Sequence, residues 1–208
     1  MTNQKQLIRN ESYEAILAYE NKTAQTITAK VLEKPELSAW MILMPIVFIL
    51  FMQRSQKYKA ASTAFCEGYL YTKKIALDTA CRIYKNEYSH EESIAMAAET
   101  VQKNPKAEQT VINIYNQQIE EIKLLCEHYL ALLASKEDKY DQMVVSHYQT
   151  EDNYLCYINR LTKTEKEVTR ATTSTFKDAV EVPEILGKME KYLWELRVEE
   201  AKQFFIQR

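Results

Sequence analysis

The fold is decided by residues 112–133, INIYNQQIEEIKLLCEHYLALL, which carry the most regular hydrophobic pattern in the chain. Apolar residues recur there at alternating steps of three and four, as in the seam of a coiled coil. The seam consists of Ile112, Tyr115, Ile119, Ile122, Cys126, Tyr129 and Leu133. This pattern predicts a long helix that buries one stripe. Two uses of the stripe remain open: the core of the protein itself, or a surface for a protein partner or a second copy of the chain.

The composition of the whole chain points to the same class of fold. The 208 residues include only two glycines and four prolines, whereas average usage predicts about 7% and about 5%. Sheet hairpins need glycine in their tight turns, and nucleotide-binding folds need it where the backbone meets phosphate. We therefore predict an all-α protein with few joints, built as a helical bundle or an antiparallel coiled-coil hairpin.

A second feature is the uncharged run at residues 37–52, LSAWMILMPIVFILFM, which would be apolar on every side of a helix. Such a helix would be ~24 Å long, against a bilayer hydrocarbon core of ~30 Å. We predict that residues 37–53 form a single transmembrane helix, kinked where proline removes a backbone donor. The residues assigned to the membrane are Leu37, Trp40, Pro45, Phe48, Phe51 and Arg54. The alternatives are a re-entrant or in-plane hairpin broken at Pro45, and a buried helix of a soluble protein.

The charges beside this run predict its orientation. Arg54, Lys57 and Lys59 follow it closely, and the more basic flank of a membrane helix stays in the cytoplasm. The four cysteines show no clustered spacing, which is typical of reduced thiols in that compartment. The chain is thus predicted to have three parts: an exported N-terminal helical segment at 1–36, the membrane segment at 37–53, and a cytoplasmic helical bundle with coiled-coil-like seams at 54–208.

Local signals predict the helix boundaries that follow. Ser89 begins a capping-box pattern, Ser135 is predicted to cap another helix, and Pro183 suits the first turn of the last one. One near-heptad stripe follows Ser135 and is interrupted at Glu151 and Glu165. We expect these helices to pack as antiparallel neighbours.

Sequence motifs for chemistry are missing. The net charge of −2, from 27 Lys and Arg against 29 Asp and Glu, gives no reason to expect a nucleic-acid partner. A dinuclear metal site in a bundle needs two Glu-x-x-His motifs, and the sequence has one, at residues 87–90. Walker, dinucleotide, GxSxG and HExxH motifs are absent from the sequence. We therefore expect no catalytic residue, cofactor or metal ligand.

Together these features predict a non-catalytic, membrane-anchored helical scaffold or assembly protein. Its expected partners are the lipid bilayer and either another protein or a second copy, bound through the helical seams. Two alternatives remain: a membrane-anchored helical-bundle enzyme or metal-binding protein, and a lipid-shaping protein with an in-plane hairpin at 37–52.

Overall fold

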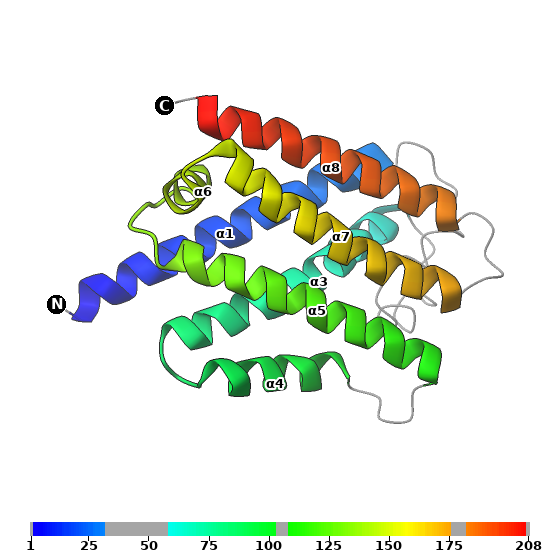
Figure 1. Ribbon diagram of the computed structural model, residues 1–208, viewed down its shortest axis with the longest axis horizontal. Coiled ribbons are helices and arrows are strands. Elements are labelled where there is room, and N and C mark those ends of the chain that lie inside the picture. The colour runs from blue at the N-terminus through cyan, green and yellow to red at the C-terminus, as the bar shows by residue number, and fades with distance from the viewer. Residues whose placement is uncertain (1, 32–57, 103–107, 176–181, 207–208) are drawn as a thin grey trace.

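The computed structural model describes residues 2–31, 58–102, 108–175 and 182–206, and within them the chain forms seven helices and no strand (Figure 1). The helices are α1 (Thr2–Val31), α3 (Tyr58–Tyr84), α4 (His90–Val101), α5 (Gln109–Leu133), α6 (Tyr140–Tyr148), α7 (Glu151–Thr175) and α8 (Val182–Ile206). The prediction of an all-α helical bundle is therefore confirmed for the described part of the chain.

Five long helices form a closed ring, which we call the five-helix ring. Around it, α1 packs against α3, α3 against α5, α5 against α7, α7 against α8, and α8 against α1. The two short helices add to this arrangement: α4 packs on α3 and α5, while α6 contacts α1, α5, α7 and α8 at one end (Figure 1). Each long helix therefore needs one buried stripe that faces the interior of the ring.

Helix α5 supplies the centre of the core with the seam that the sequence pattern marks. Five seam residues are buried in one hydrophobic cluster: Tyr115, Ile122, Cys126, Tyr129 and Leu133. The other two, Ile112 and Ile119, are half-buried. The cluster also holds Ile16 of α1, Leu77 of α3 and Tyr154 of α7. The seam thus faces inward and is used by the core of this single chain.

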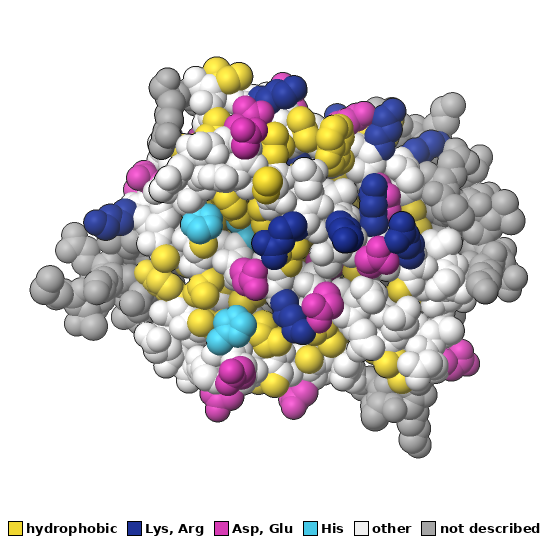
Figure 2. Space-filling model, in the orientation of Figure 1, with side chains coloured by type: hydrophobic (Ala, Val, Ile, Leu, Met, Phe, Trp, Pro, Cys, Tyr) yellow, Lys and Arg dark blue, Asp and Glu magenta, His cyan; other side chains and the backbone are white. Residues whose placement is uncertain are grey.

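One outward face of the molecule carries charged side chains of both signs among apolar ones (Figure 2). Figure 2 shows basic and acidic side chains interspersed over one face of the molecule, without a broad area of one sign. One such pair joins neighbouring helices, with Arg160 Nη2 of α7 lying 3.8 Å from Glu127 Oε2 of α5. Because both side chains are exposed, this pair adds little to stability. The apolar stripes inside the ring therefore hold the helices together.

Two of the predicted helix starts are confirmed and one is wrong. At the start of α4, Glu92 N–H donates to Ser89 Oγ (3.2 Å) and Ser89 N–H donates to the Glu92 carboxylate (2.9 Å), which forms the capping box. Pro183 lies in the first turn of α8. The start predicted at Ser135 is wrong because this residue belongs to the connection before α6, which begins at Tyr140.

The single stripe predicted after Ser135 is divided between two helices. Gln149 has φ 63°, a left-handed conformation that is uncommon for a residue other than glycine, and it ends α6. Thr150 Oγ1 then accepts a hydrogen bond from Asn153 N–H (3.2 Å) and caps α7. Glu151 consequently lies in the first turn of α7, where the helix dipole favours an acidic side chain.

Helix α1 belongs to the same body as the helices that follow residue 58. Near its end, Ile27 packs with Phe65 of α3 and Leu193 of α8, and Thr28 Oγ1 lies 3.1 Å from Cys66 Sγ of α3. The end of α1 and the first part of α3 therefore belong to one packed core.

The residues assigned to the membrane lie outside the described part of the chain. They are Leu37, Trp40, Pro45, Phe48, Phe51 and Arg54. Among the residues that the structure does describe, no helix combines the length and the apolar character needed to cross a bilayer.

The inward orientation of the seam can be tested with Ile122→Ala. Ile122 is 1% exposed, and truncating a fully buried isoleucine costs about 2–5 kcal/mol of unfolding free energy. Urea denaturation of the variant should show that loss. The exposed neighbour in Glu120→Ala should change stability by no more than about 0.5 kcal/mol, and equal effects from the two variants would contradict an inward-facing seam.

Candidate functional site

Four charged side chains meet inside the five-helix ring, one from each of four helices. They are Lys73 of α3, Glu121 of α5, Glu165 of α7 and Arg197 of α8, which we call the charge network. Lys73 Nζ lies 3.0 Å from Glu121 Oε1 and 3.2 Å from Glu165 Oε1. Arg197 donates two hydrogen bonds to Glu165, at 2.6 and 2.8 Å. The charges therefore alternate in sign along one continuous chain of contacts.

Glu165 and Lys73 of the charge network stay ionised although they are buried. Burial alone would raise the pKa of the Glu165 carboxyl, but Arg197 and Lys73 outweigh it and lower that pKa to about 2. Burial alone would lower the pKa of Lys73, and the contacts with Glu121, Tyr69 and Glu165 outweigh it, so that this pKa is raised. The network contains two basic and two acidic side chains, so their formal charges sum to zero.

The network is joined to its surroundings by further polar contacts. Thr72 Oγ1 donates to Glu121 Oε1 (2.9 Å), and Lys73 Nζ lies 4.3 Å from the centre of the Tyr69 ring, in cation–π geometry. These contacts fix the Lys73 ammonium between a carboxylate pair and an aromatic face. Side chains from more than one helix are thus needed to position these charges.

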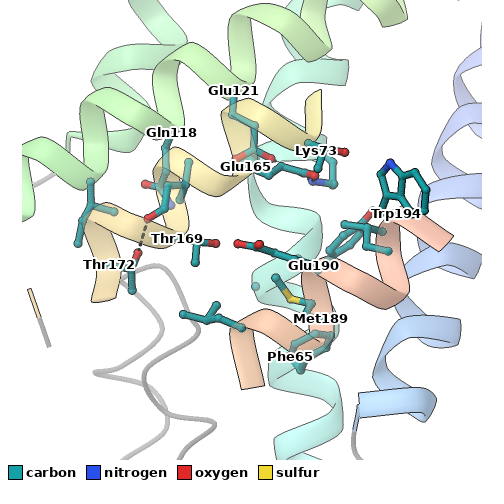
Figure 3. Close-up of a pocket in the computed structure, with 18 of the residues that line it drawn as sticks. Phe65, Lys73, Gln118, Glu121, Glu165, Thr169, Thr172, Met189, Glu190 and Trp194 are labelled. Carbon is teal, nitrogen blue, oxygen red and sulfur yellow. Dashed lines mark hydrogen bonds and ion pairs between the residues drawn. The ribbon is translucent and has the colours of Figure 1, made fainter. Parts of the chain in front are cut away.

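Beside the charge network lies a cavity of about 110 Å³, bounded by α3, α5, α7 and α8. The charged residues line it near the middle of the four helices, and apolar side chains line it toward one end of the bundle (Figure 3). These apolar residues are Phe65, Ile114, Leu186, Met189 and Leu193, with Trp194 also in the wall. Figure 3 shows Thr169 and Glu190 pointing toward each other across the cavity. The cavity therefore changes from polar to apolar along its length.

Two polar atoms in this wall are buried without a hydrogen-bond partner among the described residues. They are the Tyr69 hydroxyl of α3 and Thr162 Oγ1 of α7. Most buried polar groups in proteins are paired with protein or with water, and an unpaired one costs free energy. Both residues therefore lie in the cavity wall with the hydrogen-bonding capacity of their hydroxyls unused.

A second polar cluster, the aromatic cluster, surrounds His128 of α5. Its Nδ1 lies 2.8 Å from the Tyr148 hydroxyl and its Nε2 lies 3.2 Å from the Tyr140 hydroxyl. The Tyr157 ring stacks on the imidazole with 4.2 Å between ring centres. Burial, with His147 and Arg197 nearby, lowers the pKa of His128 to about 3. The imidazole is therefore neutral at physiological pH and is fixed by two tyrosines.

The aromatic cluster continues into the core through tyrosines of other helices. Tyr19 of α1 stacks on Tyr140 of α6 with 3.6 Å between ring centres. The Tyr129 hydroxyl donates to the buried Glu20 carboxylate at 2.8 Å, and burial raises the pKa of Glu20. These tyrosines pack closely, with hydroxyls that bond inside the protein. We therefore regard the aromatic cluster as structural and the cavity as the candidate functional site.

The residues of the charge network carry no sequence motif, but they do leave a weak signal. Glu165 interrupts an apolar stripe, and Lys73 and Arg197 each follow a cavity-lining residue, Tyr69 and Leu193, by four positions. A charge on the buried side of a helix needs a partner of opposite sign.

Within the described residues, no group of three or more His, Cys, Asp or Glu side chains is arranged to hold a metal ion.

Comparisons of the chain with models of known protein families, with curated proteins and with solved structures found no match. The site is therefore interpreted from its own geometry.

The charge network should be sensitive to the loss of one partner. Arg197→Met leaves the buried Glu165 carboxylate with Lys73 alone, and we expect a loss of about 3–5 kcal/mol in unfolding free energy. The double variant Arg197→Met/Glu165→Met keeps the Lys73–Glu121 pair and should recover most of that loss.

Denaturant titration of both variants measures these changes. Arg170→Met is the matched control, because the pair between Arg170 and Glu167 lies on the surface of α7, where it is worth no more than about 1 kcal/mol. A loss in Arg197→Met no larger than in this control would contradict a cohesive role for the network.

His128 makes stability depend on pH. In the unfolded chain its pKa is about 6.5, whereas the folded chain keeps it neutral down to about pH 3. The contribution of neutral His128 to the unfolding free energy is therefore fully present above about pH 6.5. It is lost as the pH falls toward 3. The loss should reach about 1.4 kcal/mol per pH unit.

Denaturation between about pH 7 and about pH 5 should show this slope in the unmodified protein, and a smaller slope in His128→Gln. Carboxylates such as Glu20 contribute equally to both proteins, so their effect cancels in the difference. Identical slopes would mean that His128 is not held neutral by the fold.

Proposed function

We propose that the protein is a non-catalytic helical scaffold that attaches to a membrane through residues 37–52, inserted as a hairpin from one side. The observation that carries this proposal is the contact between the end of α1 and the start of α3. Ile27 packs with Phe65, and Thr28 lies against Cys66. The described helices that flank residues 32–57 therefore lie close together near those two ends.

The dimensions of the apolar run suit a hairpin. Pro45 divides residues 37–52 into two arms of about eight residues, each ~12 Å long if helical. One leaflet of the bilayer contributes about half of the ~30 Å hydrocarbon core, so each arm matches the depth of one leaflet. Arg54 and Lys57 follow the second arm, where basic side chains are attracted to anionic lipid headgroups.

The same charges support the cytoplasmic side as the location of the helical body. Positive residues close to a membrane segment remain in the cytoplasm. A hairpin then keeps α1 and the rest of the bundle on that side together, as their common core requires. Because the α5 seam is used by this core, we propose that a protein partner would bind an outer face instead of the seam.

The proposal can be tested by vesicle flotation of the full chain. Vesicles of zwitterionic and anionic phospholipid should carry the protein to the top of a density gradient. Phe48→Asp/Phe51→Asp should remain folded by circular dichroism and stay at the bottom, because charges are costly in the hydrocarbon core. Failure of the unmodified protein to float would favour the alternative of a buried soluble helix.

A labelling experiment separates the hairpin from the single crossing. In a background with Cys66, Cys81 and Cys126 replaced by alanine, the exposed Cys156 reports the side of α7. In the same background, Cys156→Ser/Glu14→Cys reports the side of α1, since Glu14 is exposed. Both sites should react with a membrane-impermeant maleimide from the same side, and labelling from opposite sides would overturn the hairpin.

A further inference from the structure

We propose that the cavity between α3, α5, α7 and α8 binds an uncharged amphiphile with a single narrow tail. The head of this molecule, a hydroxyl or a similar group, would hydrogen-bond to the unpartnered hydroxyls of Tyr69 and Thr162, and its tail would lie among the apolar side chains. This proposal concerns helices that the structure describes and does not depend on membrane attachment.

The polar part of the cavity selects against a charged head. The two cations, Lys73 and Arg197, are already paired at 3.2 Å or less with Glu121 and Glu165. An added carboxylate or ammonium would therefore bring one excess charge into a neutral and buried network, which is unfavourable. The carboxylate of Glu190, which also lines the cavity, lies 3.9 Å from Lys166 Nζ. The buried side-chain atoms of the wall that are left without partners are neutral hydroxyls, and a hydroxyl both donates and accepts a hydrogen bond.

The apolar part of the cavity accepts a tail of limited width. Phe65, Ile114, Leu186, Met189 and Leu193 come from three helices and line the end away from the charge network. Figure 3 shows Phe65 and Met189 on the opposite side of the cavity from Lys73 and Glu121. A cavity of about 110 Å³ is similar in size to engineered cavities that hold one benzene ring. It thus has room for part of one alkyl chain or one ring, but not for two acyl chains.

The position of Trp194 makes binding measurable. Trp194 lies in the cavity wall and is 45% exposed, and the chain has only one other tryptophan, Trp40. In Trp40→Phe, all tryptophan fluorescence comes from Trp194. Ligands that enter the cavity should change that emission in a saturable way.

The experiment compares three probes with the same chain and different heads: decanol, decanoate and decylammonium, all kept below their aggregation limits. In Trp40→Phe, decanol should bind at least about tenfold more tightly than either charged probe. Equal or tighter binding of decanoate or decylammonium would overturn the assignment of an uncharged head. The absence of saturable binding by decanol would overturn the site itself.

Three variants locate the bound molecule. Tyr69→Phe and Thr162→Val each remove one hydroxyl at nearly constant volume and should weaken decanol binding about fivefold. Neither should lose stability, because the deleted hydroxyl has no partner among the described residues. Thr169→Phe places a ring in the cavity and should abolish binding.

The matched control is Thr164→Val on the same helix. Thr164 Oγ1 donates to the Arg160 carbonyl, and the residue does not line the cavity. Decanol should bind this variant as it binds Trp40→Phe alone. If Tyr69→Phe and Thr162→Val bind decanol as tightly as Thr164→Val does, the proposed head-group contacts are wrong. This conclusion holds even if Thr169→Phe fails to fold.

Discussion

The structure depends on the charge network of Lys73, Glu121, Glu165 and Arg197, which joins α3, α5, α7 and α8 in the middle of the bundle. Apolar packing drives the helices together but is non-directional, so it tolerates sliding of one helix along another. A shift by one helical turn, about 5.4 Å, would break these contacts and leave buried charges unpaired. We infer that the network sets the relative register of the four helices.

The cavity lies beside this network, and its wall contains both charged and apolar side chains. In the aromatic cluster around His128, by contrast, the rings stack and the hydroxyls find partners within the protein. The aromatic cluster and α6 lie at one end of the five-helix ring, and the apolar lining of the cavity lies toward the other end (Figure 1).

The sequence predicts where the helices lie in the chain better than it predicts which helices pack against each other. Spacing identifies the buried side of α5, and short-range hydrogen bonds identify the start of α4 at Ser89, since both depend on residues close in the chain. The sequence does not reveal the turn at Gln149, because glutamine rarely adopts a positive φ. Lys73 and Arg197 look like surface residues by type, and their partners lie on other helices, so their burial follows only from the tertiary arrangement. Likewise, the composition of residues 37–52 indicates an apolar segment, whereas the packing of α1 against α3 depends on residues far apart in the sequence.

The contact between the end of α1 and the start of α3 also has an evolutionary consequence. Because these ends are held together by Ile27 and Phe65, the connection between them does not determine the shape of the body. Lengthening such a connection costs little, with about 0.6 kcal/mol for each doubling of a loop. Insertions or deletions at this position are therefore expected to leave the packing of the helical body unchanged.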